Sequence, residues 1–85
     1  LLRDTVSSLR LDSVLSVGFS LSRSKAAEAV TSGKVQVNWA DWQKPDRQVV
    51  QGDVLTLRGL GKCVLEEVGN QTKKGRVFIT VKRYL

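Results

Sequence analysis

Apolar residues near the start of the chain recur at helical spacing. Residues 1–9 hold no strong pattern, and we expect them to form a linker or a short helix. From Arg10 onward, Leu11, Val14 and Leu15 fall on one face of a helix. Gly18 is expected to end this helix at its C′ position, because glycine adopts the left-handed backbone conformation without steric cost.

A second helix is expected to begin after Ser22, whose hydroxyl is a good N-cap. Ala26, Ala29 and Val30 give this helix a small apolar face. Gly33 is expected to end it. The small face suits close packing against the first helix, so the sequence predicts a pair of short helices joined by a tight connection.

After the second helix the period of the apolar pattern changes to two. Val35 and Val37 alternate with polar residues, which is typical of a half-buried strand. Helices followed by antiparallel strands predict an α+β fold, in which two short N-terminal helices pack on a small, mainly antiparallel sheet of about four to five strands. The other expected segments are a loop over 38–45, strands over 54–57, 63–68 and 77–81, and a polar hairpin loop over 69–75.

The charge of the chain points to a polyanionic partner. Fourteen basic residues stand against 8 acidic ones in 85 residues, which gives a net charge of +6. No apolar run approaches the roughly 20 residues that span a bilayer, so we expect no transmembrane segment. The chain has the length of one domain and does not begin with methionine. We expect the chain to be a fragment of a longer protein, in which residues 10–85 form a binding domain.

The residue types present argue against catalysis. The chain has no histidine, which is the commonest general base and metal ligand. The single cysteine, Cys63, lies in an apolar stretch and is expected to be a core residue and not a nucleophile. We therefore expect no enzyme activity, no cofactor and no metal.

Basic and hydroxyl residues gather where the second expected helix begins. A helix N-terminus offers free N–H groups and a partial positive charge, and therefore suits a phosphate. Cations there oppose the helix dipole, which makes sense if an anion docks among them, although they could simply point into water. Asp12 is expected to pair with Arg10 or Arg23, or to cap the helix, and so to aim a guanidinium. The residues of this cluster are Arg10, Ser22, Arg23, Ser24 and Lys25.

Several short motifs together resemble a known RNA-binding family. Their order and spacing are similar to those of the S-four-type RNA-binding domain, also called the alpha-L motif, from Arg10 to about Leu57. Four segments, 8–12, 37–39, 58–62 and 72–76, look like the C-terminal domain of YlmH-type proteins, which include photosystem-associated versions. The motifs are Arg10-Leu11-Asp12, Leu15, Gly18, Ser22-Arg23, Ala26, Gly33, Val35, Val37-Asn38, Lys44-Pro45 and Gly52-Asp53.

This resemblance implies a function on the ribosome. It implies binding to structured RNA, ribosomal or transfer RNA, on the large subunit, by a monomer in the cytoplasm or the plastid stroma. In some members it implies rescue of stalled ribosomes. The alternative is a protein-docking or membrane-surface module in photosystem assembly that keeps the fold. The family pattern places RNA contacts on Arg10, Ser22, Arg23, Lys25, Lys34 and Asn38, with Lys44 nearby.

Further basic residues lie beyond the family motif. A glycine-rich turn between Arg58 and Lys62 could offer backbone amides to an RNA phosphate. Lys73 and Lys74, followed by Arg76, lie in the polar hairpin loop. That loop could be a solvated tip or a finger that follows a groove or a line of phosphates, and the sequence favours neither.

Trp39 departs from the family pattern, which usually has glycine after the asparagine. A tryptophan at this position argues against an Asn-Gly type of turn with positive φ. Trp39 could stack on an unpaired base. We favour the other interpretation, in which Trp39 covers the apolar face of a hairpin, and we expect the same of Trp42.

Overall fold

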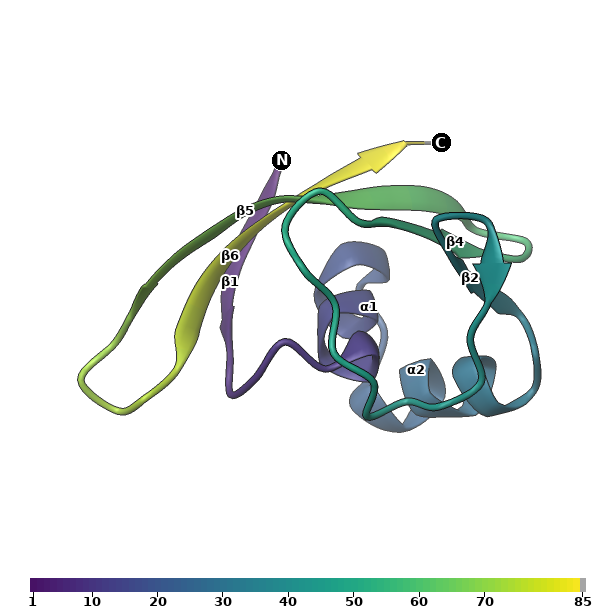
Figure 1. Ribbon diagram of the computed structural model, residues 1–85, viewed down its shortest axis with the longest axis horizontal. Coiled ribbons are helices and arrows are strands. Elements are labelled where there is room, and N and C mark those ends of the chain that lie inside the picture. Colours follow the sequence, from purple (N-terminus) through teal and green to yellow (C-terminus); the bar gives the residue numbers. More distant parts are fainter. Residues whose placement is uncertain (85) are drawn as a thin grey trace.

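Two helices lie against one face of a six-stranded antiparallel sheet (Figure 1). The computed structural model describes residues 1–84. The strand order in the sheet is β1-β6-β5-β4-β2-β3. The predicted α+β class is confirmed, with slightly more strands than expected. The elements are β1 (Leu2–Val6), α1 (Leu11–Phe19), α2 (Arg23–Thr31), β2 (Val35–Val37), β3 (Ala40–Asp41), β4 (Val54–Leu57), β5 (Gly61–Gln71) and β6 (Val77–Tyr84).

The start of the chain is a strand, so the expectation of a linker or a short helix was wrong. Strand β1 pairs antiparallel with β6, from Leu2 opposite Val81 to Val6 opposite Val77. Leu2, Asp4 and Val6 lie on one face of β1, and Val6 is buried. The charged Asp4 breaks the apolar alternation that would otherwise indicate a strand. The partner strand lies more than 70 residues later in the chain, so neighbouring residues do not predict this pairing.

Helix α1 does not end at Gly18, contrary to the sequence prediction. It continues through Phe19, and Ser20 adopts the left-handed conformation with a φ of 54°. Gly18 is buried inside the helix instead. A β-carbon built on Gly18 would lie only 2.7 Å from Cys63 Sγ and 3.3 Å from Val81 Cγ1. Glycine is needed here because α1 approaches β5 and β6 closely, and not because the helix stops.

Both predicted ends of helix α2 are confirmed. Ser22 Oγ accepts a hydrogen bond from the backbone N–H of Lys25 at 3.2 Å. After the helix, Gly33 has a φ of 80° and donates to the Val30 carbonyl, and Lys34 donates to the Ala29 carbonyl. These two bonds are those of a Schellman motif, which satisfies the last carbonyls of the helix.

The final hairpin is longer than the sequence indicated. Strand β5 runs to Gln71, which pairs with Val77, so the connecting loop is 72–76 and not 69–75. Register shifts between Leu65 and Glu67 and between Val68 and Gln71 bend the pair. Both faces of β5 are exposed near its end, so the residues there are polar on both faces and show no alternation that would predict a strand. This hairpin extends away from the helices (Figure 1).

A tight turn joins β2 to β3, where the sequence predicted a longer loop. Val37 pairs with Ala40, which leaves Asn38 and Trp39 as the two turn residues, with φ angles of 50° and 66°. Trp39 thus adopts positive φ, contrary to the sequence prediction. Such a conformation costs roughly 1–3 kcal/mol per residue and persists where the surroundings impose it.

Hydrogen bonds from Asn38 hold this turn in place. Its amide nitrogen donates to Asp53 Oδ1 at 2.9 Å, and its amide oxygen accepts from the Val54 N–H at 3.0 Å. Asp53 is itself buried and accepts from the Val50 N–H through its other oxygen. The carboxylate and the two backbone segments therefore fix the conformation of Asn38, and Trp39 follows it.

Cys63 is a core residue, as the sequence predicted. Its side chain is buried between the sheet and α1, among Leu11, Leu15 and Val81 in the same apolar cluster. Burial raises the pKa of the thiol from 9.0 to about 12, against a smaller opposing effect of Arg83. The group therefore stays a neutral thiol near neutral pH, which does not suit a nucleophile.

The buried thiol predicts a specific loss of stability in alkali. Because the folded pKa is raised, the unfolded chain releases this proton first, and stability falls as pH rises above the unfolded pKa of about 9. We expect Cys63 to contribute a loss of about 1.4 kcal/mol at pH 10 relative to pH 7. Urea unfolding of the unchanged chain and of Cys63→Ala at both pH values measures the change in the free energy of unfolding. An equal loss in both proteins would contradict the prediction.

Candidate nucleic-acid interface

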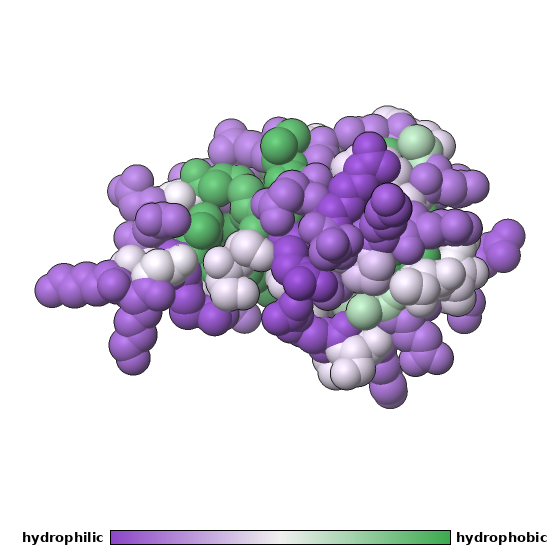
Figure 2. Space-filling view, turned by 60° about the horizontal axis from the view of Figure 1, so that its bottom comes forward, coloured by the Kyte–Doolittle hydropathy of each residue, from purple (hydrophilic) through white to green (hydrophobic). Residues whose placement is uncertain are grey.

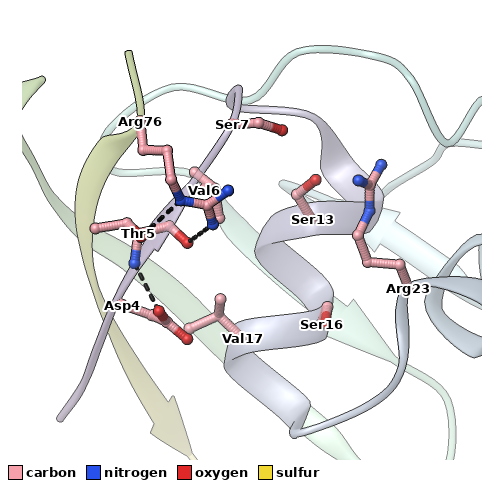
Figure 3. A pocket seen from close by; sticks show the side chains of 9 residues that line it. All are labelled: Asp4, Thr5, Val6, Ser7, Ser13, Ser16, Val17, Arg23 and Arg76. Carbon is pink, nitrogen blue, oxygen red and sulfur yellow. Dashed lines mark hydrogen bonds between the residues drawn. The ribbon is translucent and has the colours of Figure 1, made fainter. Parts of the chain in front are cut away.

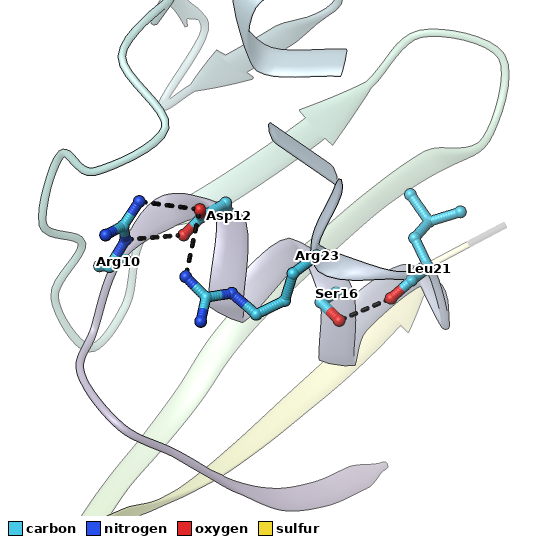
Figure 4. A network of polar contacts seen from close by, with 5 residues as sticks. All are labelled: Arg10, Asp12, Ser16, Leu21 and Arg23. Carbon is cyan, nitrogen blue, oxygen red and sulfur yellow. Dashed lines mark hydrogen bonds and ion pairs between the residues drawn. The ribbon is translucent and has the colours of Figure 1, made fainter. Parts of the chain in front are cut away.

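A buried carboxylate holds two guanidinium groups at the start of the helical pair (Figure 4). Arg10 donates Nε to Asp12 Oδ1 at 3.1 Å and Nη2 to Oδ2 at 3.0 Å. Arg23 donates Nη2 to the same Oδ2 at 3.4 Å. The Asp12 side chain is only 4% exposed, whereas those of Arg10 and Arg23 are 37% and 53% exposed. Asp12 therefore aims the guanidiniums, as the sequence predicted.

The patch stays positively charged after this pairing. One carboxylate faces Arg10 and Arg23, and the exposed Lys25 adds a third cation, which leaves two net positive charges. Guanidiniums carry five donors in a planar fork, so each can bind an anion while it contacts Asp12. We call Arg10, Ser22, Arg23, Ser24 and Lys25 the helix-end patch.

Helix α2 adds backbone donors to the helix-end patch. The N–H groups of its first turn have no partners within the helix, except that Ser22 Oγ serves Lys25. Ser24 is exposed in the same turn. Together with the helix dipole, this arrangement suits a phosphate group. Polar side chains cover most of the helical side of the molecule, next to one apolar area (Figure 2).

The loop between β3 and β4 brings a further cation beside the patch. The backbone N–H of Asp12 donates to the Pro45 carbonyl at 3.1 Å, and that of Leu11 donates to the Arg47 carbonyl at 2.9 Å. The exposed Lys44 directly precedes Pro45 and so lies near the start of α1. Sequence reasoning missed Arg47, whose guanidinium lies 3.7 Å from the centre of the Trp42 ring. Only the folded loop shows this stacking.

A groove of about 220 Å³ runs beside the patch, between β1 and α1 (Figure 3). Arg23 lines one side of it. Arg76 lines the other, where it donates to Thr5 Oγ1 at 2.9 Å and to the Thr5 carbonyl at 2.6 Å. Ser13 lines the groove from α1, and its buried Oγ has no hydrogen-bond partner within the described residues. Sequence reasoning missed Ser13, because a hydroxyl on a helix gives no signal of this kind.

Two of the predicted cations lie at the opposite end of α2. Lys34 follows the C-terminus of that helix and accepts a backbone hydrogen bond from Arg58 at 2.9 Å. Both line a second hollow, of about 430 Å³, with Gln36 and Thr56. Gln36 and Thr56 pair across β2 and β4, and the residues on either side of each are buried in the core, namely Val35, Val37, Leu55 and Leu57. This hollow is therefore on the sheet face opposite the helices.

The remaining predicted residues lie elsewhere. Lys62 is on β5, and its ammonium lies 5.5 Å from the Tyr84 ring, with Lys82 at 5.2 Å on the same ring. Lys73 and Lys74 are exposed at the tip of the long hairpin. The structure thus brings together the helix-end patch and Lys44, and it separates Lys34, Arg58, Lys62 and the hairpin lysines from them. Lys82 was missed, although the alternation of the last strand could have indicated it.

Comparison with known proteins assigns the family. A family model described as "S4 domain" matches residues 9–55, which is more than half of the chain. The chain belongs to the S4 domain family. This S4 domain is 42% identical over 80 residues to the "Ribosome-associated protein quality control protein P2" of Bacillus subtilis (strain 168). The match covers 94% of this chain and 31% of that protein, so the chain spans about a third of its relative's length.

A solved structure shares the fold. The S4 domain superposes on a chain described as "Crystal structure of pseudouridylate synthase" with a TM-score of 0.58 and 25% sequence identity. The match covers 74% of this chain and 26% of the other. It supports the arrangement of helices on a sheet described above.

Neither helix in residues 1–84 has the length and apolar character that crossing a membrane requires. Within the same residues, no three acidic or cysteine side chains cluster in a way that could hold a metal ion.

Proposed function

We propose that this S4 domain binds structured RNA on the ribosome through the helix-end patch. The observation that carries the proposal is the buried Asp12, which orients Arg10 and Arg23 without neutralising them. Family membership and the ribosome-associated relative support the same conclusion. Recognition rests on shape and phosphates, because the cations lie at helix and loop ends and not on an aromatic sheet platform.

The finer parts of the proposal rest on the family resemblance of the sequence. We propose ribosomal or transfer RNA on the large subunit as the binding partner and the cytoplasm as the location, and the ribosome-associated relative supports a partner on the ribosome. We propose that the domain has no catalytic activity, cofactor or metal of its own, which fits the absence of histidine from the sequence. No observation favours the alternative of a protein-docking or membrane-surface module in photosystem assembly.

Replacing Arg23 with alanine is expected to weaken the affinity for structured RNA about fivefold. The change removes one charge-assisted phosphate contact, while Arg10 keeps its two hydrogen bonds to Asp12 and the fold is preserved. Fluorescence anisotropy with a labelled ribosomal RNA stem-loop measures the affinity, and circular dichroism checks the fold.

Arg3→Ala is the matched control for this experiment. Arg3 is an exposed arginine on β1, at the opposite edge of the sheet from β2 and β3, and it pairs with Thr80 of β6. The two variants lose the same charge. The helix-end patch is not the binding site if Arg23→Ala binds as tightly as the unchanged chain. The same holds if Arg23→Ala and Arg3→Ala bind with equal affinity.

A further inference from the structure

Trp39 is displayed on the surface and does not cover the hairpin. The residue is 67% exposed, the most of any large aromatic residue in the part of the chain that the structure describes. Trp42 instead packs partly buried against the core and stacks under Arg47. The interpretation that both tryptophans cover apolar surface therefore holds for Trp42 and is wrong for Trp39.

The backbone at Trp39 is strained, and nothing in the packing of the domain requires a large side chain there. The turn residues have positive φ, a conformation that glycine adopts freely and tryptophan does not. Asn38 and the buried Asp53 fix the turn, so the indole is presented on a rigid support. A strained and exposed residue held by a buried network indicates a role in binding.

The surroundings of Trp39 favour a nucleic acid as its partner. On the same hairpin, Gln36 donates to Asp41 at 3.2 Å, and both residues line the second hollow together with Lys34 and Arg58. At a rise of about 3.3 Å per residue, Lys34 lies roughly 13 Å along β2 from the turn. The hollow is polar, and its two cations, Lys34 and Arg58, outnumber its one carboxylate, Asp41. This balance suits a sugar-phosphate backbone better than an apolar protein surface.

We propose that the β2–β3 hairpin binds an unpaired nucleotide of the RNA, whose base stacks on Trp39 while the adjoining backbone runs toward Lys34 and Arg58. This inference rests on the proposed function, and it adds a second contact with a different chemistry. The helix-end patch binds phosphates of paired RNA, whereas the hairpin binds an unpaired base that is not stacked within a helix. Lys34 and Arg58 line the same hollow, so the RNA backbone next to the stacked base can contact both cations there.

Two RNA probes test this proposal: a short stem with one bulged adenine and the same stem fully paired. The intact chain is expected to bind the bulged stem about five- to tenfold more tightly, because base–aromatic stacking contributes at this level. Trp39→Gly is expected to abolish that preference and to leave the affinity for the paired stem unchanged. Since glycine relieves the strained turn, this variant should unfold at an equal or higher urea concentration.

Control variants separate the outcomes. Trp39→Phe should keep a preference of about threefold, because a smaller aromatic face still stacks, and Trp42→Phe should keep the full preference. Arg23→Ala should weaken both probes equally. A Trp39→Gly chain that still prefers the bulged stem, or an intact chain without a preference, overturns the stacking site while the proposed function stands. If neither stem binds the intact chain, the proposed function itself fails.

Discussion

Raising the salt concentration from 50 to 200 mM is expected to lower the affinity for structured RNA by roughly two to three decades. Each phosphate that a cation neutralises releases condensed counterions, with a slope of about −0.7 to −0.9 in log affinity against log salt. The estimate assumes about five contacts. The helix-end patch supplies Arg10, Arg23 and Lys25, and the adjoining loop supplies Lys44 and Arg47. Anisotropy titrations at four salt concentrations measure the slope.

The same titration identifies which cations engage. Arg23→Ala should reduce the slope by nearly one, because one phosphate contact is lost, and Arg3→Ala should leave it unchanged. An affinity that barely responds to salt would show that phosphates do not dominate the interaction. A slope that Arg3→Ala reduces as much as Arg23→Ala would place the RNA elsewhere on the domain.

Gly18→Ala is expected to destabilise the domain by about 1–3 kcal/mol, although alanine is the better helix former. Alanine in place of glycine inside a helix usually gains about 1 kcal/mol. Here the new methyl group would lie 2.7 Å from Cys63 Sγ and 3.3 Å from Val81 Cγ1. Both neighbours are fully buried, so α1 must shift away from the sheet. Urea unfolding monitored by circular dichroism measures the change in the free energy of unfolding.

A double-mutant cycle identifies the cause of this loss. Cys63→Ala removes the Sγ atom that the new methyl group would meet, at the cost of a small cavity. In the Cys63→Ala background, Gly18→Ala should therefore cost much less, with a coupling energy of at least about 1 kcal/mol. Additive effects of the two changes would contradict the close approach of α1 to β5 as the reason for Gly18.

Local patterns in the sequence predicted much of the fold. The helical spacing of Leu11, Val14 and Leu15 and the N-cap at Ser22 depend only on neighbouring residues. The Schellman motif at Gly33 is local as well. Strands β2 and β4 were predicted because one face of each is buried and the other is not, so that polarity alternates.

The errors fell where a distant partner decides the local structure. Strand β1 forms because it pairs with the free edge of β6, and the end of β5 is a strand because it pairs with β6 on the other side. Gly18 was interpreted as a helix end because its packing against Cys63, 45 positions later, cannot be read from its neighbours. The Asn38–Trp39 turn needed Asp53, which fixes Asn38 from another loop.

By itself, the sequence determined the charge of the domain, its two helices and the residue types at the start of α2, because these depend on composition and on contacts within a few positions. The tertiary structure alone decided which cations act together. Asp12 joins Arg10 and Arg23, which are 13 positions apart, while Lys34 and Arg58 meet at the other end of α2. It also decided that Trp39 faces solvent, since exposure depends on how segments pack around a side chain and not on the side chain itself.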